Sequence, residues 1–229
     1  MTFPNLLPAA VIFDMDGVLV DSNPYHLRKW ADFLDEHQIP YNPDDLPNQI
    51  LGQRNDTAFR FFFGSQLSDG DILRLSEELE ERFRQVFRPH AKPLPGLDTL
   101  IAACHRAAIP MAVASSAMAK NVEFIVEVLG FRSYFRCLVT GDAVTHPKPH
   151  PEIYLKTAQK LGIEPAACVT FEDSYVGVES AKGAGMKCVA IASTFPLEEL
   201  RERTHADLIV RSFEDVTLDT LRQLFEGNR

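Results

Sequence analysis

Six short apolar runs, each followed by polar residues, constrain the fold of this 229-residue chain more than any other feature. Near-continuous hydrophobic runs of this length are typical of strands that are buried on both faces of a parallel sheet. The runs are 9–12, 111–114, 137–140, 168–171, 188–191 and 207–210. Each run from the second onward is preceded by a segment whose apolar residues have helical spacing. These segments lie at about 97–108, 118–129, 150–162, 175–185 and 197–204. This alternation predicts an α/β fold with a doubly wound parallel sheet, that is, a Rossmann-like core.

The segment from residue 22 to residue 91 interrupts the alternation. Its apolar residues are spaced as in helices over 24–38, 55–63 and 68–88, and it contains no good strand. We therefore expect an α-helical insertion at 22–91, with residues 1–21 and 92–229 forming the α/β core. The second junction is rich in proline, as a stiff hinge would be.

Composition and charge exclude several classes of protein. The hydrophobic share of 45% is that of a globular chain, and the formal net charge of −9 argues against a nucleic-acid binder, which needs a basic surface. No apolar run is long enough to span a bilayer, and the N-terminus lacks the features of a signal peptide. The cysteines form no C-x-x-C pair, which indicates free, buried thiols for Cys168 and Cys188. We expect a cytoplasmic monomer that binds neither nucleic acid nor a membrane.

Two carboxylates follow the first predicted strand. Asp14 and Asp16 would point to the same side of an extended chain, and Gly17 comes directly after them. Two like charges at the end of a buried strand would repel each other, and a divalent cation between them removes this difficulty. Oxygen ligands of this kind suit Mg²⁺. Capping of a turn or helix is the alternative interpretation for a single Asp, but it does not explain the pair.

Polar residues also follow the other predicted strands. In doubly wound sheets ligands bind outside the carboxyl ends of the strands, so we expect these residues to converge. They are Ser115 and Ser116, Gly141 and Asp142, and Glu172 and Asp173. Glu172 and Asp173 are suited to hold a metal, although Asp173 is also suited to cap the helix that follows it.

The pattern suits phosphoryl transfer. Asp14 can attack a phosphate monoester and form an aspartyl-phosphate, and Asp16 can give a proton to the leaving oxygen and later take one from water. The transferring group is anionic, so the site needs positive charge. Lys148 lies among three prolines that restrict its backbone, and it is the candidate for this charge. His146 and His150 are not assigned to a metal, because we expect no acidic partner near them.

Four motifs, in this order, resemble those of the haloacid dehalogenase-like hydrolases. They are Asp14-x-Asp16-Gly17-Val18-Leu19-x-Asp21, Ser115 after its strand, Lys148-Pro149, and Glu172-Asp173 with Gly177. The resemblance covers essentially the whole chain, and the insertion is similar to the small helical cap of that superfamily. The pattern Tyr25-His26-x-Arg28-x-Trp30 is similar to the group of β-phosphoglucomutases and sugar-phosphate phosphatases.

This resemblance implies a role for each motif residue. Asp14 would be the nucleophile and Asp16 the acid/base. Phosphate and substrate would be bound by Ser115, Ser116, Lys148, His26, Gly52 and Arg54. The cofactor Mg²⁺ would be held by Asp14, Asp16, Asp173 and Glu172. For His26 the alternative is packing within the cap, and for Arg54 it is an ordinary solvated side chain.

The resemblance implies a Mg²⁺-dependent phosphatase that hydrolyses a small phosphorylated metabolite, a sugar phosphate, through an aspartyl-phosphate. A phosphosugar mutase similar to β-phosphoglucomutase is the alternative. Ala117-Met118-Ala119 lacks the Ser-Lys pair that such a mutase would carry there, which favours hydrolysis. A phosphoacceptor module without catalysis is a third interpretation, which the size of the insertion and the presence of Asp16 disfavour.

Overall fold

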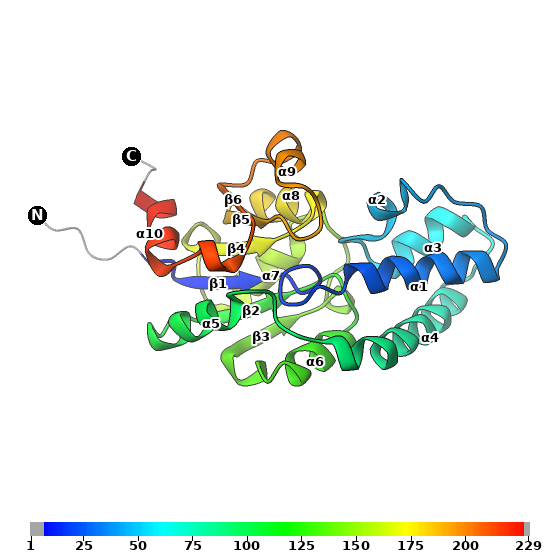
Figure 1. Ribbon diagram of the computed structural model, residues 1–229, viewed down its shortest axis with the longest axis horizontal. Helices are drawn as coiled ribbons and strands as arrows, with labels where there is room; N and C mark the ends of the chain where they lie inside the picture. Colours follow the sequence, from blue (N-terminus) through cyan, green and yellow to red (C-terminus); the bar gives the residue numbers. More distant parts are fainter. Residues whose placement is uncertain (1–6, 227–229) are drawn as a thin grey trace, which may run out of the picture.

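The computed structural model describes residues 7–226, which form an α/β core with a group of helices beside it (Figure 1). Within this range, six parallel strands make one sheet in the order β3-β2-β1-β4-β5-β6. Their bounds are β1 Ala10–Phe13, β2 Met111–Ala114, β3 Phe135–Val139, β4 Cys168–Glu172, β5 Lys187–Ile191 and β6 Leu208–Val210. The predicted doubly wound parallel sheet is confirmed.

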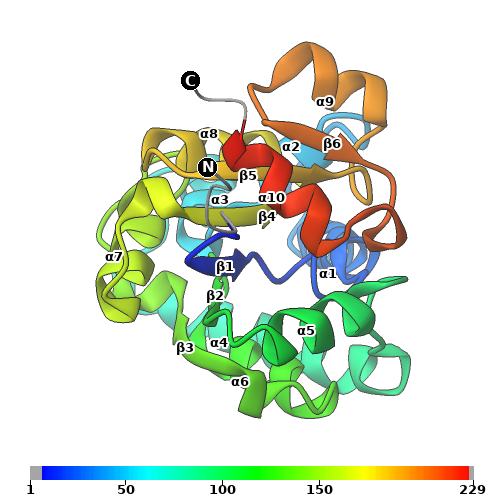
Figure 2. The same ribbon diagram turned by 90° about the vertical axis from the view of Figure 1, so that its left-hand side faces the viewer.

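Helices cover both faces of this sheet. Side chains alternate between the faces along a strand, so that Val11 and Phe13 of β1 lie in one hydrophobic cluster and Ala10 and Ile12 in the other. The first cluster includes residues of α5 (Leu97–Arg106), α6 (Ala119–Val128) and α10 (Leu218–Glu226), and the second includes residues of α7 (Glu152–Leu161), α8 (Tyr175–Gly183) and α9 (Leu197–Arg203). Figure 2 shows α7 and α8 on one side of the sheet and α5 and α6 on the other. Burial on both faces explains why the strand sequences are continuously apolar.

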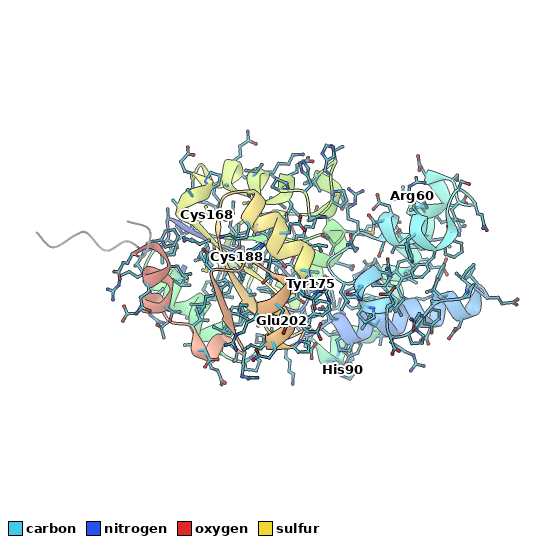
Figure 3. The ribbon with its side chains drawn as sticks, turned by 90° about the horizontal axis from the view of Figure 1, so that it is seen from above. Arg60, His90, Cys168, Tyr175, Cys188 and Glu202 are labelled. Carbon is cyan, nitrogen blue, oxygen red and sulfur yellow. The ribbon has the colours of Figure 1, made fainter. Side chains whose placement is uncertain are left out.

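Two neighbouring strands carry buried thiols. Cys168 in β4 and Cys188 in β5 are free and buried, as predicted (Figure 3). Burial raises the pKa of Cys168 to about 11 and that of Cys188 to about 12, so both thiols stay protonated at neutral pH. Their role is packing within the sheet.

The edge strand β3 differs from its prediction. It begins at Phe135 rather than at residue 137, and Arg136 is exposed. An edge strand pairs on one side only, here with β2, and it is less covered than the strands inside the sheet. The predicted start was wrong because the first residues of this strand are not continuously apolar.

The inserted segment is helical. It contains α1 (Asn23–Glu36), α2 (Leu46–Ile50), α3 (Asn55–Phe63) and α4 (Asp69–Phe87), and in Figure 1 the arrow of β1 points towards these helices. Trp30, Phe33 and Phe59 belong to a hydrophobic cluster of its own. The five-residue α2 was not predicted, because so short a helix shows no period. Phe83 and Phe87 of α4 instead join the cluster of the α/β core. The domain boundaries at residues 22 and 91 stay a prediction.

Helix α4 is 19 residues long and carries many charged side chains. No helix in the part of the chain that the structure describes is both long and apolar enough to cross a bilayer.

The order of the strands reverses at β1. The chain adds β2 and β3 on one side of β1, and then β4, β5 and β6 on the other. At such a switch point a crevice forms outside the carboxyl ends of the two central strands, and ligands bind there. The ends of β1 and β4 are therefore the place where a functional site is expected.

The turn before α5 gives a test of this packing. Gly96 has φ of +82°, and a Cβ at this residue would lie 2.5 Å from the backbone nitrogen of Glu214. We predict that Gly96→Ala lowers the free energy of unfolding by roughly 2–5 kcal/mol, because left-handed backbone costs about 1–2 kcal/mol and a forced shift of packed groups costs about 1–3 kcal/mol. Urea denaturation followed by circular dichroism measures this loss.

Gly130→Ala is the matched control. Gly130 has φ of +70°, but among the described residues beyond its chain neighbours no atom lies within 4 Å of a Cβ placed there. Only the backbone cost of about 1–2 kcal/mol is expected. Equal losses in the two variants would contradict a role for the contact between Gly96 and the segment at Glu214.

Candidate active site

Three buried carboxylates meet at the ends of β1 and β4. Asp14, Glu172 and Asp173 each offer an oxygen, and these oxygens all lie within 4.8 Å of one another. The backbone N–H of Asp14 donates to the carbonyl of Phe171 over 3.0 Å, which holds the end of β1 against β4. The fold thus forces three acidic groups together where water hardly reaches them.

Lys148 lies between two of these carboxylates. Its Nζ is 2.9 Å from Oδ1 of Asp14 and 2.5 Å from Oε1 of Glu172, and its side chain is 1% exposed. The hydroxyl of Tyr154, in α7, donates to the same oxygen of Glu172. Prolines on both sides of Lys148 restrict the loop that carries it. The loop before α7 therefore supplies the positive charge that the strand ends lack.

The ionisation of this cluster is strongly perturbed. Burial raises the pKa of Asp14 well above its usual value, and the charges of Glu172 and Asp173 add to this against the opposing effect of Lys148. Burial, together with the charge of Glu172, raises the pKa of Asp173 to about 7. Burial disfavours the charge of Lys148, but Asp14 and Glu172 outweigh it and raise the pKa of the ammonium. Three carboxylates against one ammonium leave a formal charge of −2 in a buried site.

The donor set fits a divalent metal ion. A doubly charged cation balances the remaining charge of the cluster, and carboxylate oxygens are the ligands that hard cations prefer. Asp14, Glu172 and Asp173 are the residues that would hold it. The carboxylate of Asp16 is not part of this cluster, and the predicted binding of the metal by Asp16, through its backbone carbonyl, stays a prediction.

Asp173 is held by groups from two other segments. The amide of Asn23, at the start of α1, donates to its Oδ2 over 2.9 Å, and the hydroxyl of Thr194 donates to the same oxygen. Gly17 has φ of +74°, and a Cβ there would lie 1.9 Å from this oxygen. Only glycine lets the backbone after Asp16 pass so close to Asp173.

The carboxylate of Asp16 points towards the first helix of the insertion. Its Oδ1 accepts hydrogen bonds from Ser22 over 2.5 Å and from Nε2 of His26 over 3.1 Å. The Nζ of Lys29 lies 3.0 Å from the other ring nitrogen, Nδ1. An ammonium only donates, so Nδ1 accepts and the proton of the neutral ring is on Nε2. Burial raises the pKa of Asp16, but His26 and Ser22 outweigh it and lower the pKa.

A cavity lies between the strand ends and the helical insertion. The core lines it with Asp14, Asp16 and residues 115–118, and the insertion lines it with Asn23, His26, Trp30, residues 50–53, Asn55 and Glu80. The backbone N–H of Ser115 donates to the carbonyl of Val139 over 3.0 Å, so Ser115 is fixed beside the end of β3. The hydroxyl of Ser116 donates to the carbonyl of Gly52 over 2.9 Å. The structure therefore brings Ser115, Ser116, His26 and Gly52 around the cavity that contains Asp14.

Arg54 and Asp142 line a neighbouring pocket instead. The guanidinium of Arg54 donates to both oxygens of Asp56, over 3.0 and 2.7 Å, and to the carbonyl of Val144 over 3.0 Å. Asp142 accepts the backbone N–H of Ala119 over 2.7 Å, at the start of α6. The structure does not bring Arg54 to the cavity of Asp14, and its role in substrate binding stays a prediction.

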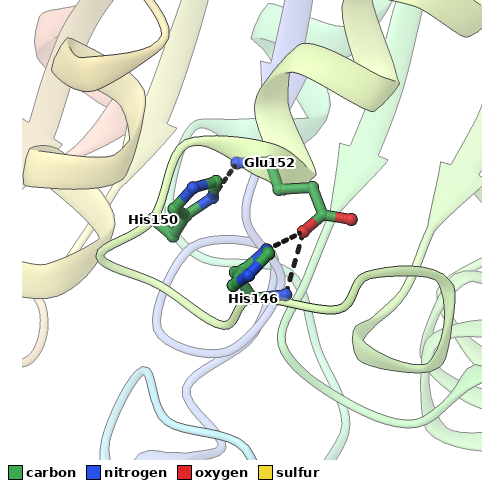
Figure 4. Close-up of side chains that lie close together, drawn as sticks. All are labelled: His146, His150 and Glu152. Atoms are coloured by element: carbon green, nitrogen blue, oxygen red, sulfur yellow. Dashed lines mark hydrogen bonds and ion pairs between the residues drawn. The ribbon is translucent and has the colours of Figure 1, made fainter.

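The expectation that His146 and His150 have no acidic partner was wrong, because Glu152 lies beside them (Figure 4). One oxygen of Glu152 accepts both the backbone N–H and the Nδ1–H of His146, each over 2.9 Å. The other oxygen lies 2.6 Å from Nζ of Lys156. The ring of His150 accepts the backbone N–H of Glu152 over 3.2 Å. Because these bonds use both oxygens of Glu152, we interpret the group as a brace for the loop that carries Lys148.

Sequence reasoning missed Tyr154, Asn23 and Thr194. Tyr154 lies in the predicted helix directly after the Lys148 loop, and Asn23 lies two residues after Asp21, so nearness in the chain was the available signal. Thr194 follows the predicted strand at 188–191 closely, and the rule that strand ends carry functional groups points to it.

A buried carboxylate at a topological switch point, with a lysine beside it, an acidic cluster suited to a cation and a helical cap above, defines a capped enzyme of the α/β type. The family model described as "Haloacid dehalogenase-like hydrolase" matches residues 11–191. The chain therefore belongs to the haloacid dehalogenase-like hydrolase family and is an enzyme of its phosphatase and phosphomutase kind, as its motifs predicted.

Individual relatives agree with this assignment. The fructose-1-phosphate phosphatase YqaB of Escherichia coli (strain K12) is 32% identical over 185 residues, which cover 80% of this chain and 96% of the relative. The β-phosphoglucomutase of Bacillus subtilis (strain 168) is 29% identical over 227 residues, 96% of each chain. The crystal structure of a HAD hydrolase, family IA, variant 3, from Entamoeba histolytica has a TM-score of 0.85 at 27% identity, and the match covers 95% of this chain and 99% of that one.

The raised pKa of Asp173 predicts how the metal-free protein responds to pH. This pKa is about 7 in the folded protein against an ordinary 3.8. The folded state then binds the proton more tightly than the unfolded state, so the contribution of Asp173 to stability falls as the pH rises from about 4 to about 7. We predict that Asp173→Asn raises the free energy of unfolding at pH 8 by on the order of 1–3 kcal/mol, because the amide removes a buried charge. Urea denaturation in the presence of a chelator measures the difference.

Asp44→Asn is the control for this measurement, since Asp44 is exposed and its replacement should have no such effect. At pH 4 the Asp173 variant and the wild type should have similar stability. A variant that is less stable than the wild type at pH 8 would contradict the unfavourable charge.

Proposed function

We propose that this enzyme is a Mg²⁺-dependent phosphatase that hydrolyses a small phosphorylated metabolite, a sugar phosphate, through an aspartyl-phosphate. The observation that carries the proposal is the Asp14 carboxylate at the switch point, fixed through Oδ1 by Lys148 and lining the cavity below the cap. The name and sequence similarity of the fructose-1-phosphate phosphatase support it.

In the first half of the reaction, Asp14 attacks the phosphorus and the bond to the sugar oxygen breaks. Mg²⁺ held by Asp14, Glu172 and Asp173 would offset the negative charge of the transferring group. Lys148 adds a fixed ammonium beside the nucleophile, and the hydroxyl of Ser115 is suited to donate to a phosphate oxygen. Because the cluster is buried and its donors are already oriented, little reorganisation is needed when charge develops.

Asp16 is suited to the proton transfers. In the free enzyme its lowered pKa keeps it ionised, which suits the second half of the reaction, where it takes a proton from the attacking water. In the first half it must give a proton to the leaving sugar oxygen. The approach of an anionic substrate raises the pKa of a neighbouring carboxylate and so favours the protonated form.

A phosphosugar mutase is the second candidate. It is supported by the B. subtilis β-phosphoglucomutase, which matches 96% of this chain, including the cap. A mutase would use the same Asp14, and a sugar hydroxyl would take the place of water. The segment Ala117-Met118-Ala119 lacks the Ser-Lys pair that the resemblance implies for such a mutase, so hydrolysis is our first choice. A cytoplasmic location and a monomeric state stay predictions.

The first test of function is a product assay. The enzyme with Mg²⁺ should release inorganic phosphate from hexose and hexitol monophosphates over many turnovers, and a chelator should abolish the activity. Phosphate release is measured by colorimetry, and sugar products are separated by chromatography. An isomerised sugar phosphate without phosphate release would favour the mutase, and a single turnover without product would favour a phosphoacceptor.

The second test concerns the nucleophile. Asp14→Asn should lower kcat by roughly 10³-fold or more, because the amide cannot attack the phosphorus. Asp142→Asn is the control, since it follows another strand and its amide oxygen still accepts the N–H of Ala119. We expect its kcat to stay within about threefold of the wild type. Substantial turnover by Asp14→Asn would remove Asp14 from the nucleophile role.

A further inference from the structure

The end of the cavity that the cap forms has no cationic lining. Within the described residues, the cap lines it with Asn23, His26, Trp30, residues 50–53, Asn55 and Glu80, and none of these is a lysine or an arginine. A second phosphate on a substrate would need positive charge at this end, because phosphate groups are bound by lysine and arginine side chains or by oriented N–H groups. The ammonium of Lys148 lies instead beside Asp14 at the strand ends, 2.9 Å from its Oδ1.

Two cations of the cap, Lys29 and Arg54, are already paired with carboxylates. Lys29 lies 2.6 Å from Oε1 of Glu80, and both side chains are almost fully buried. Arg54, outside the cavity lining, binds both oxygens of Asp56. Neither charge is available to a second phosphate without the loss of an existing ion pair.

Glu80 is the charged group that the cap presents to the cavity. Its Oε1 accepts hydrogen bonds from Lys29 and, over 2.8 Å, from the amide of Asn55, and its Oε2 accepts one from Asn121 over 2.6 Å. Burial raises the pKa of Glu80, but the charge of Lys29 and the hydrogen bonds from Lys29 and Asn55 outweigh it and lower the pKa to about 2. Glu80 is therefore an ionised carboxylate whose charge is balanced by Lys29. The pair offers an oxygen acceptor to a hydroxyl and no net positive charge to a phosphate.

Asn55 and Trp30 complete this end. The amide of Asn55 spends one N–H on Glu80, and its carbonyl oxygen is an acceptor for a hydroxyl. The ring of Trp30 offers an apolar surface, of the kind that lines most small-molecule sites. A chain of hydroxyl groups on a carbon skeleton matches both features.

We infer that the cap end of the cavity accepts an uncharged, hydroxyl-bearing end of the substrate and rejects a second phosphate, with Glu80 and Asn55 as the specificity-determining residues. The substrate class is then a sugar or polyol monophosphate. The inference rests on the proposed function and narrows it. A mutase forms a sugar bisphosphate when the phosphoryl group of the aspartyl-phosphate is transferred to a second hydroxyl, and the described residues of the cap that line this cavity offer that second phosphate no lysine or arginine.

The test compares matched substrates. The hexose or hexitol monophosphate that the wild type hydrolyses fastest is paired with the bisphosphate of the same sugar, and p-nitrophenyl phosphate serves as a reference that lacks sugar hydroxyls. We expect kcat/KM for the monophosphate to exceed that for the bisphosphate by at least about 100-fold. Equal values, or a preference for the bisphosphate, would overturn the inference and leave the phosphatase proposal in place. Failure to hydrolyse any of the three esters would instead overturn the phosphatase proposal.

Variants of Glu80 identify the cause of the preference. Glu80→Gln removes the anion and uncovers the charge of Lys29, so the ratio of monophosphate to bisphosphate kcat/KM should fall at least about tenfold. A ratio compares two substrates of one variant, so a loss common to all substrates cancels. Glu78→Gln is the matched control, since Glu78 lies on the same helix and forms an exposed ion pair with Arg82. Its ratio should stay within about twofold of the wild type.

The double variant Lys29→Met/Glu80→Gln keeps the net charge of the pair at zero and avoids an unpaired buried ammonium. Its ratio should lie between those of the wild type and Glu80→Gln, because it loses the anion without uncovering a cation. If Glu80→Gln does not fold, the ratio measured for the double variant tests the role of Glu80 in its place. A wild-type ratio in whichever of these variants folds would overturn the role of Glu80.

Discussion

The contact of the Lys148 ammonium with Asp14 and Glu172 is the interaction on which the rest of the site depends. Three carboxylates are forced together at the ends of β1 and β4, and burial raises the pKa of Asp14 and Asp173. The buried ammonium of Lys148 stabilises part of the negative charge of these carboxylates, and the hydroxyl of Tyr154 donates a further hydrogen bond to Glu172. The cluster is then short of two positive charges. A site that is incomplete in this way favours a divalent cation and an anionic ligand together, since each offsets the charge of the other.

The topology of the sheet brings these groups together, and the cap junction is built into the same network. Asp14 and Asp173 come from strands that are neighbours in the sheet but lie more than 150 residues apart in the chain. Ser22 and Asn23, where the insertion begins, bind Asp16 and Asp173 respectively. The position of α1 is therefore tied to two carboxylates of the site. A shift of the cap against the core would alter the hydrogen bonds to both carboxylates.

Much of this architecture could be predicted from the sequence, for a physical reason. Strands buried on both faces must be apolar throughout, so β1, β2, β4 and β5 were visible as runs, whereas the half-exposed edge strand β3 was placed two residues late. The rule that functional groups follow the carboxyl ends of strands identified Asp14, Ser115 and Glu172. The partners of these residues were not predictable in the same way. The bond from Asn23 to Asp173 joins residues 150 positions apart, and only the packing of the cap against the core selects it.

The buried ion pair of Lys29 and Glu80 also could not be predicted from the sequence. Under the proposed function it connects substrate selection with catalysis. A buried ion pair adds little net stability, because desolvation of two charges offsets most of their attraction. Its consequence here is the orientation of His26. Lys29 donates to Nδ1 of His26, which leaves the ring proton on Nε2 to donate to Asp16. A substrate hydroxyl that binds Glu80 competes with Lys29 for the same carboxylate. Under the proposed function, a change at Glu80 would be transmitted through Lys29 and His26 to Asp16, the proposed acid/base.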